Sequence, residues 1–220
     1  MPIRIDGNEV SGVTLDNQDV SEVTVDGDVV FTAGPTIIDD FEDGNLNEYV
    51  SDVNSFSVTQ SNPISGNNSL QIPNSGGRNI ASNTLPNIPS EGDSFSVKFR
   101  ADNWSNGQLY ITFGCTSDFV PFTRGSGNYI RFGDEFNSFD IGEDPGSRSQ
   151  DNFSYTNGAN YRCEVDYGVN TLSAELFENG NSVATNSFNR TNFINNSHIG
   201  VARLNRISFT ALVDDFILLD

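Results

Sequence analysis

Lysine is almost absent from this chain. Lys98 is the only lysine among 220 residues, and it stands with ten arginines against 30 acidic residues, which gives a net charge of −19. A surface this negative repels nucleic-acid phosphate and anionic membranes, so we expect no nucleic-acid partner. Strong salt screens such repulsion, because the Debye length falls to about 3 Å at 1 M. Scarce Lys beside retained Arg therefore favours a protein adapted to high salt over a merely acidic surface domain.

Long apolar runs are also missing, so we expect no membrane insertion. The opening residues, MPIRIDGNEV, include an early Asp and lack the apolar region of a secretory signal. If the protein works outside a cell, either it leaves by another route or its signal is missing from this sequence.

Cysteine is limited to Cys115 and Cys163. Strand alternation places Cys115 with Ile111 and Phe113, and it places Cys163 opposite Glu164. We expect both thiols to be buried. The spacing leaves a single disulfide or two free thiols open, and it favours free thiols.

Helical periodicity is absent, whereas short segments that alternate apolar and polar residues recur between clusters of Gly, Asn, Asp, Ser and Pro. The pattern predicts an all-β fold, a sandwich or a barrel over 37–220, joined by a linker at 34–36 to a small β-repeat module at 1–33. Asn179-Gly180 is the strongest hairpin signal. The predicted strands of the sandwich lie within 55–60, 68–73, 94–101, 107–115, 128–134, 137–143, 160–167, 171–180, 181–188, 197–203 and 207–220.

Four stretches resemble the concanavalin A-like lectin/glucanase jelly rolls, which include laminin-G-like domains. They are IIDDFEDGNLNEYVSD, NPISGNNSLQIP, NYRCEVDYGVNTLSAELFENGNSVAT and ALVDDFILLD. The resemblance spans most of 37–220 and implies that this part is an antiparallel jelly-roll β-sandwich of the concanavalin A-like type, preceded by the small N-terminal β-repeat module.

The glucanase members of that group carry a Glu-x-Asp-x-Glu-like trio on one strand. Here Glu164 and Asp166 occupy the first two positions, but Gly168 replaces the third carboxylate. Their neighbours Cys163 and Val165 have the character of inward residues, so we expect both acids to face solvent. The protein is therefore expected not to be an enzyme, with a glycoside hydrolase kept as the remote alternative.

The resemblance also implies a structural Ca²⁺ near the first and last strands. Calcium requires six to eight oxygen ligands. Asp40, Glu42 and Asp215 are the predicted ligands, from DDFEDG and VDDF. The competing interpretation is a solvated acidic face.

Two aromatic residues are candidates for glycan binding. Trp104 stands in the polar stretch RADNWSNGQ, and Tyr129 belongs to the glycine- and serine-rich segment TRGSGNYIRF. An exposed aromatic ring there could stack on a sugar. The alternative for Trp104 is packing at the rim of the sandwich.

The first 32 residues contain three ten-residue lines, IRIDGNEVSG, VTLDNQDVSE and VTVDGDVVFT. A repeat this small cannot bury a core alone and needs neighbours. Because Gly34-Pro35 separates the repeat from the sandwich, we expect the sandwich not to cover the apolar residues of the repeat. The repeat is therefore expected to mediate homo-oligomerisation or docking onto a larger particle. The apolar residues expected to make these contacts are Val10, Val13, Leu15, Val20, Val23, Val25 and Val30.

This repeat is similar to short N-terminal anchoring repeats in structural proteins of tailed viruses, including those of haloarchaea. The resulting hypothesis is a virion surface protein, a capsid turret, spike or tail-fibre component, assembled in the host cytoplasm. Its partners would be other virion proteins and host surface glycans. The alternative is a secreted or cell-surface carbohydrate-binding protein of a halophile.

Overall fold

The protein divides into two compact units in the computed structural model, residues 1–36 and 37–220. The first unit is described by the backbone of its strands, and the second is described with side chains over most of its length. The described residues are 4–5, 8–9, 14–15, 18–19, 22–25 and 28–32 in the first group, and 35–72, 77–102, 104, 107–133, 138–204 and 210–219 in the second.

Three antiparallel hairpins make up the described part of the first unit. They pair β1 (Arg4–Ile5) with β2 (Asn8–Glu9), β3 (Thr14–Leu15) with β4 (Gln18–Asp19), and β5 (Glu22–Val25) with β6 (Asp28–Thr32). Equivalent strand pairs recur every ten residues: Arg4 pairs with Glu9, Thr14 with Asp19, and Thr24 with Val29. One hairpin therefore corresponds to one ten-residue line.

The side chains predicted to mediate oligomerisation lie outside the described part of the structure. Val10, Val13 and Val20 lie outside the described residues, as do the side chains of Leu15, Val23, Val25 and Val30. Self-association of the repeat stays a prediction.

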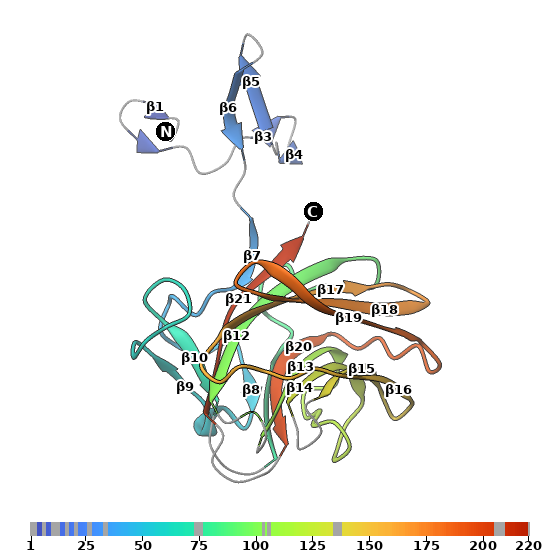
Figure 1. Ribbon diagram of the computed structural model, residues 1–220. Coiled ribbons are helices and arrows are strands. Elements are labelled where there is room, and N and C mark those ends of the chain that lie inside the picture. Colours follow the sequence, from blue (N-terminus) through green and yellow to red (C-terminus); the bar gives the residue numbers. More distant parts are fainter. Residues whose placement is uncertain are drawn as a thin grey trace. The chain divides into compact units, whose positions relative to one another are not determined.

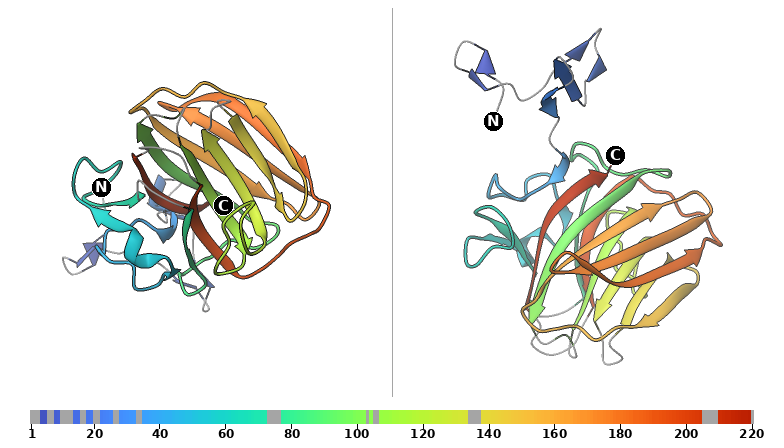
Figure 2. Two further views of the ribbon diagram at one scale, coloured as in Figure 1. Left: turned by 90° about the horizontal axis from the view of Figure 1, so that it is seen from below. Right: turned by 45° about the horizontal axis from the view of Figure 1, so that its top comes forward.

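The second unit is a sandwich of two antiparallel sheets, drawn from three sides in Figures 1 and 2. Sheet I has the order β19-β18-β17-β12-β21-β10-β9, and β7 also pairs with β21. Its strands are β7 (Thr36–Asp39), β9 (Ser57–Thr59), β10 (Ser69–Ile72), β12 (Ser94–Asp102), β17 (Asn160–Tyr167), β18 (Thr171–Glu178), β19 (Asn181–Asn189) and β21 (Thr210–Leu219).

Sheet II has the order β16-β15-β14-β13-β20-β11-β8. Its strands are β8 (Val50–Ser51), β11 (Arg78–Ser82), β13 (Gln108–Cys115), β14 (Gly127–Gly133), β15 (Ser138–Asp144), β16 (Arg148–Asn152) and β20 (His198–Leu204). A short 3₁₀ helix, Val53–Ser55, precedes β9. Among the described residues, no helix is long and apolar enough to cross a membrane.

Alternation along the strands builds the core between the sheets. In β17 the residues Tyr161, Cys163, Val165 and Tyr167 are buried, while the residues between them face outward. Phe95 and Phe113 from opposite sheets meet edge to face, with ring centroids 5.3 Å apart. Such aromatic pairs add to the stabilisation that area burial alone provides.

The predicted all-β fold is confirmed, and each of the predicted strand segments contains a strand. The turn at Asn179-Gly180 is also confirmed: both residues have positive φ, 51° and 81°, as a two-residue type I′ hairpin requires. The sequence analysis missed β8, β11 and β16. β8 is only two residues long, β11 is buried at four successive positions, and β16 is a polar edge strand, so none of them shows the alternation that marks a strand.

Both cysteines are buried free thiols, as favoured from the sequence. The predicted face of Cys115 was wrong. The register of β13 shifts between Phe113 and Cys115, where Gly114 has a φ of 51°. Ile111 and Phe113 therefore face the main core, whereas Cys115 joins Tyr110, Phe119, Tyr129 and Ala202 in a second cluster.

This second cluster lies on the outer face of sheet II, since Ile130 and Phe132 of β14 face the main core and Tyr129, the residue before Ile130, faces the opposite side. The segment 116–126 folds over it. Phe119 is fully buried there, and the ring of Phe122 meets the ring of Tyr129 at 5.3 Å. The outer face of sheet II is therefore covered in this region.

Candidate functional site

A groove of about 640 Å³ lies on the outer face of sheet I, across β12, β17, β18 and β19. The side chains that point outward from these strands supply most of its polar lining. They are Ser94, Glu164, Asp166, Ser173, Glu175 and Ser187. This volume is within the usual range of small-molecule sites in proteins, about 300–1,000 Å³.

Strand pairing sets the arrangement of the carboxylates. Glu164 of β17 stands directly opposite Glu175 of β18, and Asp166 stands opposite Ser173. Arg162 forms an ion pair with Glu164. Asp166 and Glu175 form no hydrogen bond or ion pair with any residue that the structure describes. Two carboxylates thus remain available to accept hydrogen bonds from a ligand.

Like charges directly opposite each other on a sheet are destabilising. The Glu164–Glu175 pair carries this cost in the floor of the groove, where Arg162 offsets it from one side only. No Lys or Arg belongs to the described lining of the groove. The groove is therefore suited to ligands that donate hydrogen bonds and that carry no negative charge.

One wall of the groove is fixed by a contact between the two sheets. The side-chain amide of Asn186, on the edge strand β19, donates to the carbonyl oxygen of Phe139 at 2.7 Å and to that of Ser149 at 3.3 Å. Both Asn186 and Ser149 line the groove. These hydrogen bonds hold the edge of sheet I against β15 and β16, so the wall is preformed.

The prediction that Glu164 and Asp166 face solvent is confirmed, because Cys163 and Val165 between them are buried in the core. Glu175 was missed by the sequence analysis, which sought the third carboxylate on the same strand. A signal for it was present. The turn after Tyr167 sets the register of β18, and that register places Glu175 beside Glu164.

The residues predicted to bind glycans do not fit that role. Trp104 is only 2% exposed and packs on Tyr155, with ring centroids 4.6 Å apart, and on Phe99 at 5.8 Å. Tyr129 is fully buried beneath the segment 116–126. The alternative of a packed Trp104 is therefore correct, and the prediction for Tyr129 was wrong. A residue's neighbours along the chain do not reveal whether a loop covers it.

The predicted calcium ligands do not converge on one site, because each carboxylate is engaged by other protein groups. Glu42 accepts hydrogen bonds from the backbone N–H groups of Asn67 at 2.7 Å and Asn68 at 2.9 Å, and Asp40 accepts one from its neighbour Glu42 at 3.1 Å. Asp215 is paired with Lys98, whose Nζ lies 2.6 Å from Oδ2. Within the described residues, no group of three or more His, Cys, Asp or Glu side chains is arranged to hold a metal ion. Asp40, Glu42 and Asp215 do not fit a shared calcium site.

Two carboxyl groups near the predicted metal site have raised pKa values. Burial raises the pKa of Asp39 to about 6, against the opposing effect of hydrogen bonds from the Tyr49 hydroxyl and the Phe41 N–H. Burial likewise raises the pKa of Asp214, which accepts hydrogen bonds from Ser69 Oγ at 2.7 Å and from the Ser65 N–H at 3.0 Å. Protein donors therefore hold both carboxylates.

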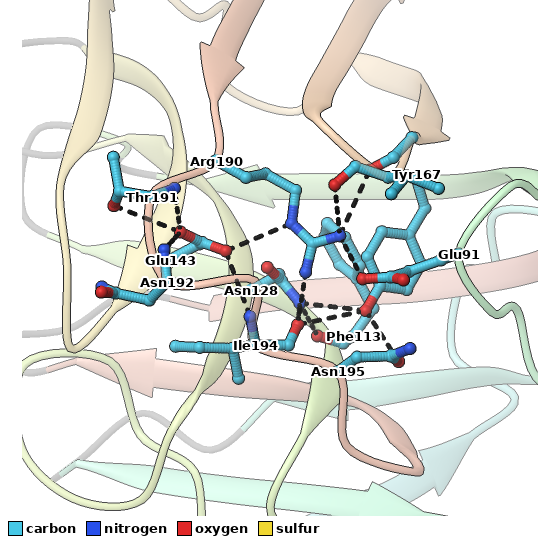
Figure 3. A network of polar contacts seen from close by, with 12 residues as sticks. Glu91, Phe113, Asn128, Glu143, Tyr167, Arg190, Thr191, Asn192, Ile194 and Asn195 are labelled. Carbon is cyan, nitrogen blue, oxygen red and sulfur yellow. Dashed lines mark hydrogen bonds and ion pairs between the residues drawn. The ribbon is translucent and has the colours of Figure 1, made fainter.

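A polar network fixes the segment 190–197 to the sandwich (Figure 3). Arg190 and Glu143 are both fully buried, and Arg190 also forms an ion pair with Glu91. Glu143 accepts hydrogen bonds from the backbone N–H groups of Thr191 and Asn192, each at 2.9 Å. Burial raises the pKa of Glu143, but these donors and Arg190 outweigh it, so the net shift is downward. The network is internal and structural.

Comparisons with known proteins identify the fold and leave the family open. No family model matches the chain, and no curated protein sequence matches it. Among solved structures, the exoplasmic/lumenal domain of VIP36, in its Ca²⁺/Man3GlcNAc-bound form, matches with a TM-score of 0.56 and 12% identity, covering 78% of this chain and 83% of that one.

Two plant lectins match similarly. The lectin of Bauhinia forficata in complex with GalNAc has a TM-score of 0.52 and 14% identity, and covers 81% of this chain and 94% of its own. The seed lectin of Lotus tetragonolobus matches with a TM-score of 0.50 and 14% identity, and the match covers 80% of this chain and 94% of the lectin. The second unit has a concanavalin A-like jelly-roll fold. At these identities the likeness shows the fold alone.

Proposed function

We propose that the jelly-roll unit is a carbohydrate-binding module whose ligand lies in the groove on the outer face of sheet I. The observation that carries the proposal is the free carboxylate pair, Asp166 and Glu175, among the hydroxyl groups of Ser94, Ser173 and Ser187. Carboxylate oxygens accept hydrogen bonds from adjacent sugar hydroxyls, and charge-assisted bonds of this kind are about twice as strong as neutral ones. Serine hydroxyls act as donors or acceptors and complete the recognition of a polyhydroxy ligand.

The charge of the groove excludes anionic saccharides, and we propose neutral saccharides as the ligand class. Glu164, Asp166 and Glu175 disfavour an anionic sugar, and the net charge of −19 acts in the same direction. The similar solved structures support this proposal at the level of fold, since two of them are described with bound sugars.

A glycan array probed with the full chain in molar NaCl tests the proposal. We expect neutral oligosaccharides to bind and sialylated or sulfated oligosaccharides to show no detectable binding. The variants Asp166→Asn and Glu175→Gln should each weaken a neutral hit by about tenfold, which corresponds to about 1.4 kcal/mol for one charge-assisted hydrogen bond. Asp102→Asn is a matched control, because Asp102 is an exposed carboxylate at the far end of β12 on the same sheet.

We further propose that this binding is non-catalytic. The third position of the glucanase-like trio is Gly168, and Glu164 is engaged by Arg162. Hydrolysis of a panel of β-glucans, measured as reducing ends released, tests this part. Turnover that disappears in Glu164→Gln would establish a glycoside hydrolase in its place.

The register of the three N-terminal hairpins favours a second, assembly role. Each hairpin repeats the preceding one ten residues later, and units of this kind need neighbours to cover their apolar faces. We propose that the repeat anchors or oligomerises the protein, as in the surface protein of a virion in high salt. Light scattering of the full chain and of a chain that begins at Pro35 tests it. If both chains are monomeric, self-association of the repeat is contradicted.

A further inference from the structure

A second hollow lies on the same face of sheet I, next to the groove. It has a volume of about 300 Å³, and the residues that define it are Ile64, Lys98, Asn160, Arg162, Phe177 and Asn179. Its lining differs from that of the groove, since it offers an aromatic ring, two cations, two amides and an aliphatic side chain. These are groups that contact both the faces and the hydroxyls of a sugar.

The groove and the hollow are continuous along two strands. Three successive outward pairs of β17 and β18 are Asp166 with Ser173, Glu164 with Glu175, and Arg162 with Phe177. The first two pairs line the groove, and the third lines the hollow. At about 3.4 Å per residue, the stripe from Asp166 to Arg162 is about 14 Å long. This length exceeds what one monosaccharide covers.

The junction between the two depressions is held in place by charge. Arg162 lies over the ring of Phe177, 4.4 Å from its centroid, and forms an ion pair with Glu164. Phe177 and Glu164 hold the guanidinium group in place, and the Arg162 side chain, about 38% exposed, stays accessible to a ligand. A planar cation fixed on an aromatic ring is a preorganised contact surface, which lowers the entropic cost of binding.

Lys98 closes the other side of the hollow. Its Nζ contacts Asp215 at 2.6 Å and donates to Ser65 Oγ at 2.9 Å. The carboxylates of Asp215 and Glu164 balance the two cations, so the hollow carries no excess positive charge that would select an anion. The hollow therefore suits the same neutral chemistry as the groove.

We infer that the hollow is a second subsite, which receives the next sugar units of an oligosaccharide whose first units lie in the groove. This inference rests on the proposed function of the groove. It makes the ligand an extended neutral oligosaccharide that runs along β17 and β18, so affinity rises with chain length until the hollow is filled.

The sole lysine provides a direct test of occupancy. An amine-acylating reagent can modify only Lys98 and the N-terminal amine of the full chain, and mass spectrometry separates the two products. A series of oligosaccharides of increasing length, taken from an array hit, is added in molar NaCl. We expect the longer members to bind about tenfold more tightly than the shortest one and to slow acylation of Lys98, while the N-terminal amine reacts at its free rate.

Variants assign the effect to the hollow. Phe177→Ala, and independently Asn160→Ala, should abolish the gain in affinity with length and restore Lys98 labelling, while binding of the shortest ligand stays unchanged. Phe193→Ala is the control, because Phe193 is a 54% exposed phenylalanine that lines neither the groove nor the hollow.

The outcomes separate the two claims. If no oligosaccharide of any length binds, the proposed function of the groove fails. If short and long ligands bind equally and Lys98 is acylated at its free rate in every complex, the groove retains its function and the second subsite is overturned.

Discussion

Arg190 and Glu143 form an ion pair in which both side chains are fully buried, with Arg190 Nε donating to Glu143 Oε1 at 3.2 Å. Figure 3 shows that this pair stands at the centre of the contacts that hold the segment 190–197. Burying two charges is costly unless each also has hydrogen-bond partners. The backbone N–H groups of Thr191, Asn192 and Ile194 donate to Glu143. The guanidinium group of Arg190 donates to the carbonyl oxygens of Gly168, Val169 and Ile194.

Removing one partner of this pair should therefore be strongly destabilising. Arg190→Met leaves a buried carboxylate without its cation, and we expect a loss of about 3–5 kcal/mol in the free energy of unfolding. Urea denaturation measures it. The control is Arg78→Met, which breaks an exposed pair with Asp52 at 3.6 Å and should cost less than about 1 kcal/mol. Equal losses in the two variants would contradict the structural role of Arg190.

Asp39 should make the fold less stable as the pH rises. Its pKa in the folded protein is about 6, against an ordinary value of 3.8, so the folded state binds this proton more tightly than the unfolded state. The stability that the protonated carboxyl contributes is full below about pH 4 and is lost as the pH rises to 6.

The variant Asp39→Asn isolates this effect, because its amide oxygen can still accept the Tyr49 hydroxyl. The difference between wild type and variant should change by on the order of 1 kcal/mol between pH 4 and pH 7. Denaturant midpoints across that range measure it. A difference that does not vary with pH would show that Asp39 titrates normally.

Calcium should not act through Glu42, since that carboxylate is occupied by the N–H groups of Asn67 and Asn68. Glu42→Gln should lower the melting temperature by the same amount in calcium and in EDTA, through weaker anchoring of residues 67–68. Thermal melts under both conditions measure it. A calcium-dependent stabilisation that is present in wild type and lost in Glu42→Gln would restore the metal site that the sequence predicted.

Salt should stabilise the whole protein. With a net charge of −19, self-repulsion opposes the compact state, and molar salt reduces its range to about 3 Å. We expect the melting temperature to rise from 0.1 M to 2 M NaCl, and to rise less in the double variant Asp102→Asn, Asp151→Asn. A melting temperature that is independent of salt would contradict the adaptation to high salt inferred from composition.

Much of the fold was predictable, because alternation of apolar and polar residues determines which face of a strand is buried. The pattern in β17 correctly separated Cys163 and Val165 from Glu164 and Asp166. Cys115 was misplaced because one residue in left-handed geometry, Gly114, reverses the alternation beyond it. Such a bulge has no reliable signature in a single sequence.

The site was less predictable than the fold. Trp104 and Tyr129 have polar neighbours in the sequence, yet loop and core contacts bury both. Glu175 joins Glu164 in the groove only through pairing across the sheet, and Phe177 joins Arg162 in the hollow in the same way. Binding surfaces on sheets are made by cross-strand neighbours, whereas linear motifs report neighbours along one strand.

Titration calorimetry of a neutral oligosaccharide, identified on the array, into the full chain in molar NaCl tests the central claim most directly. We expect wild type and Asp102→Asn to bind with the same affinity, and Glu175→Gln and Asp166→Asn each to bind about tenfold more weakly. Undiminished binding in both groove variants would contradict it, as would the absence of any neutral saccharide that binds.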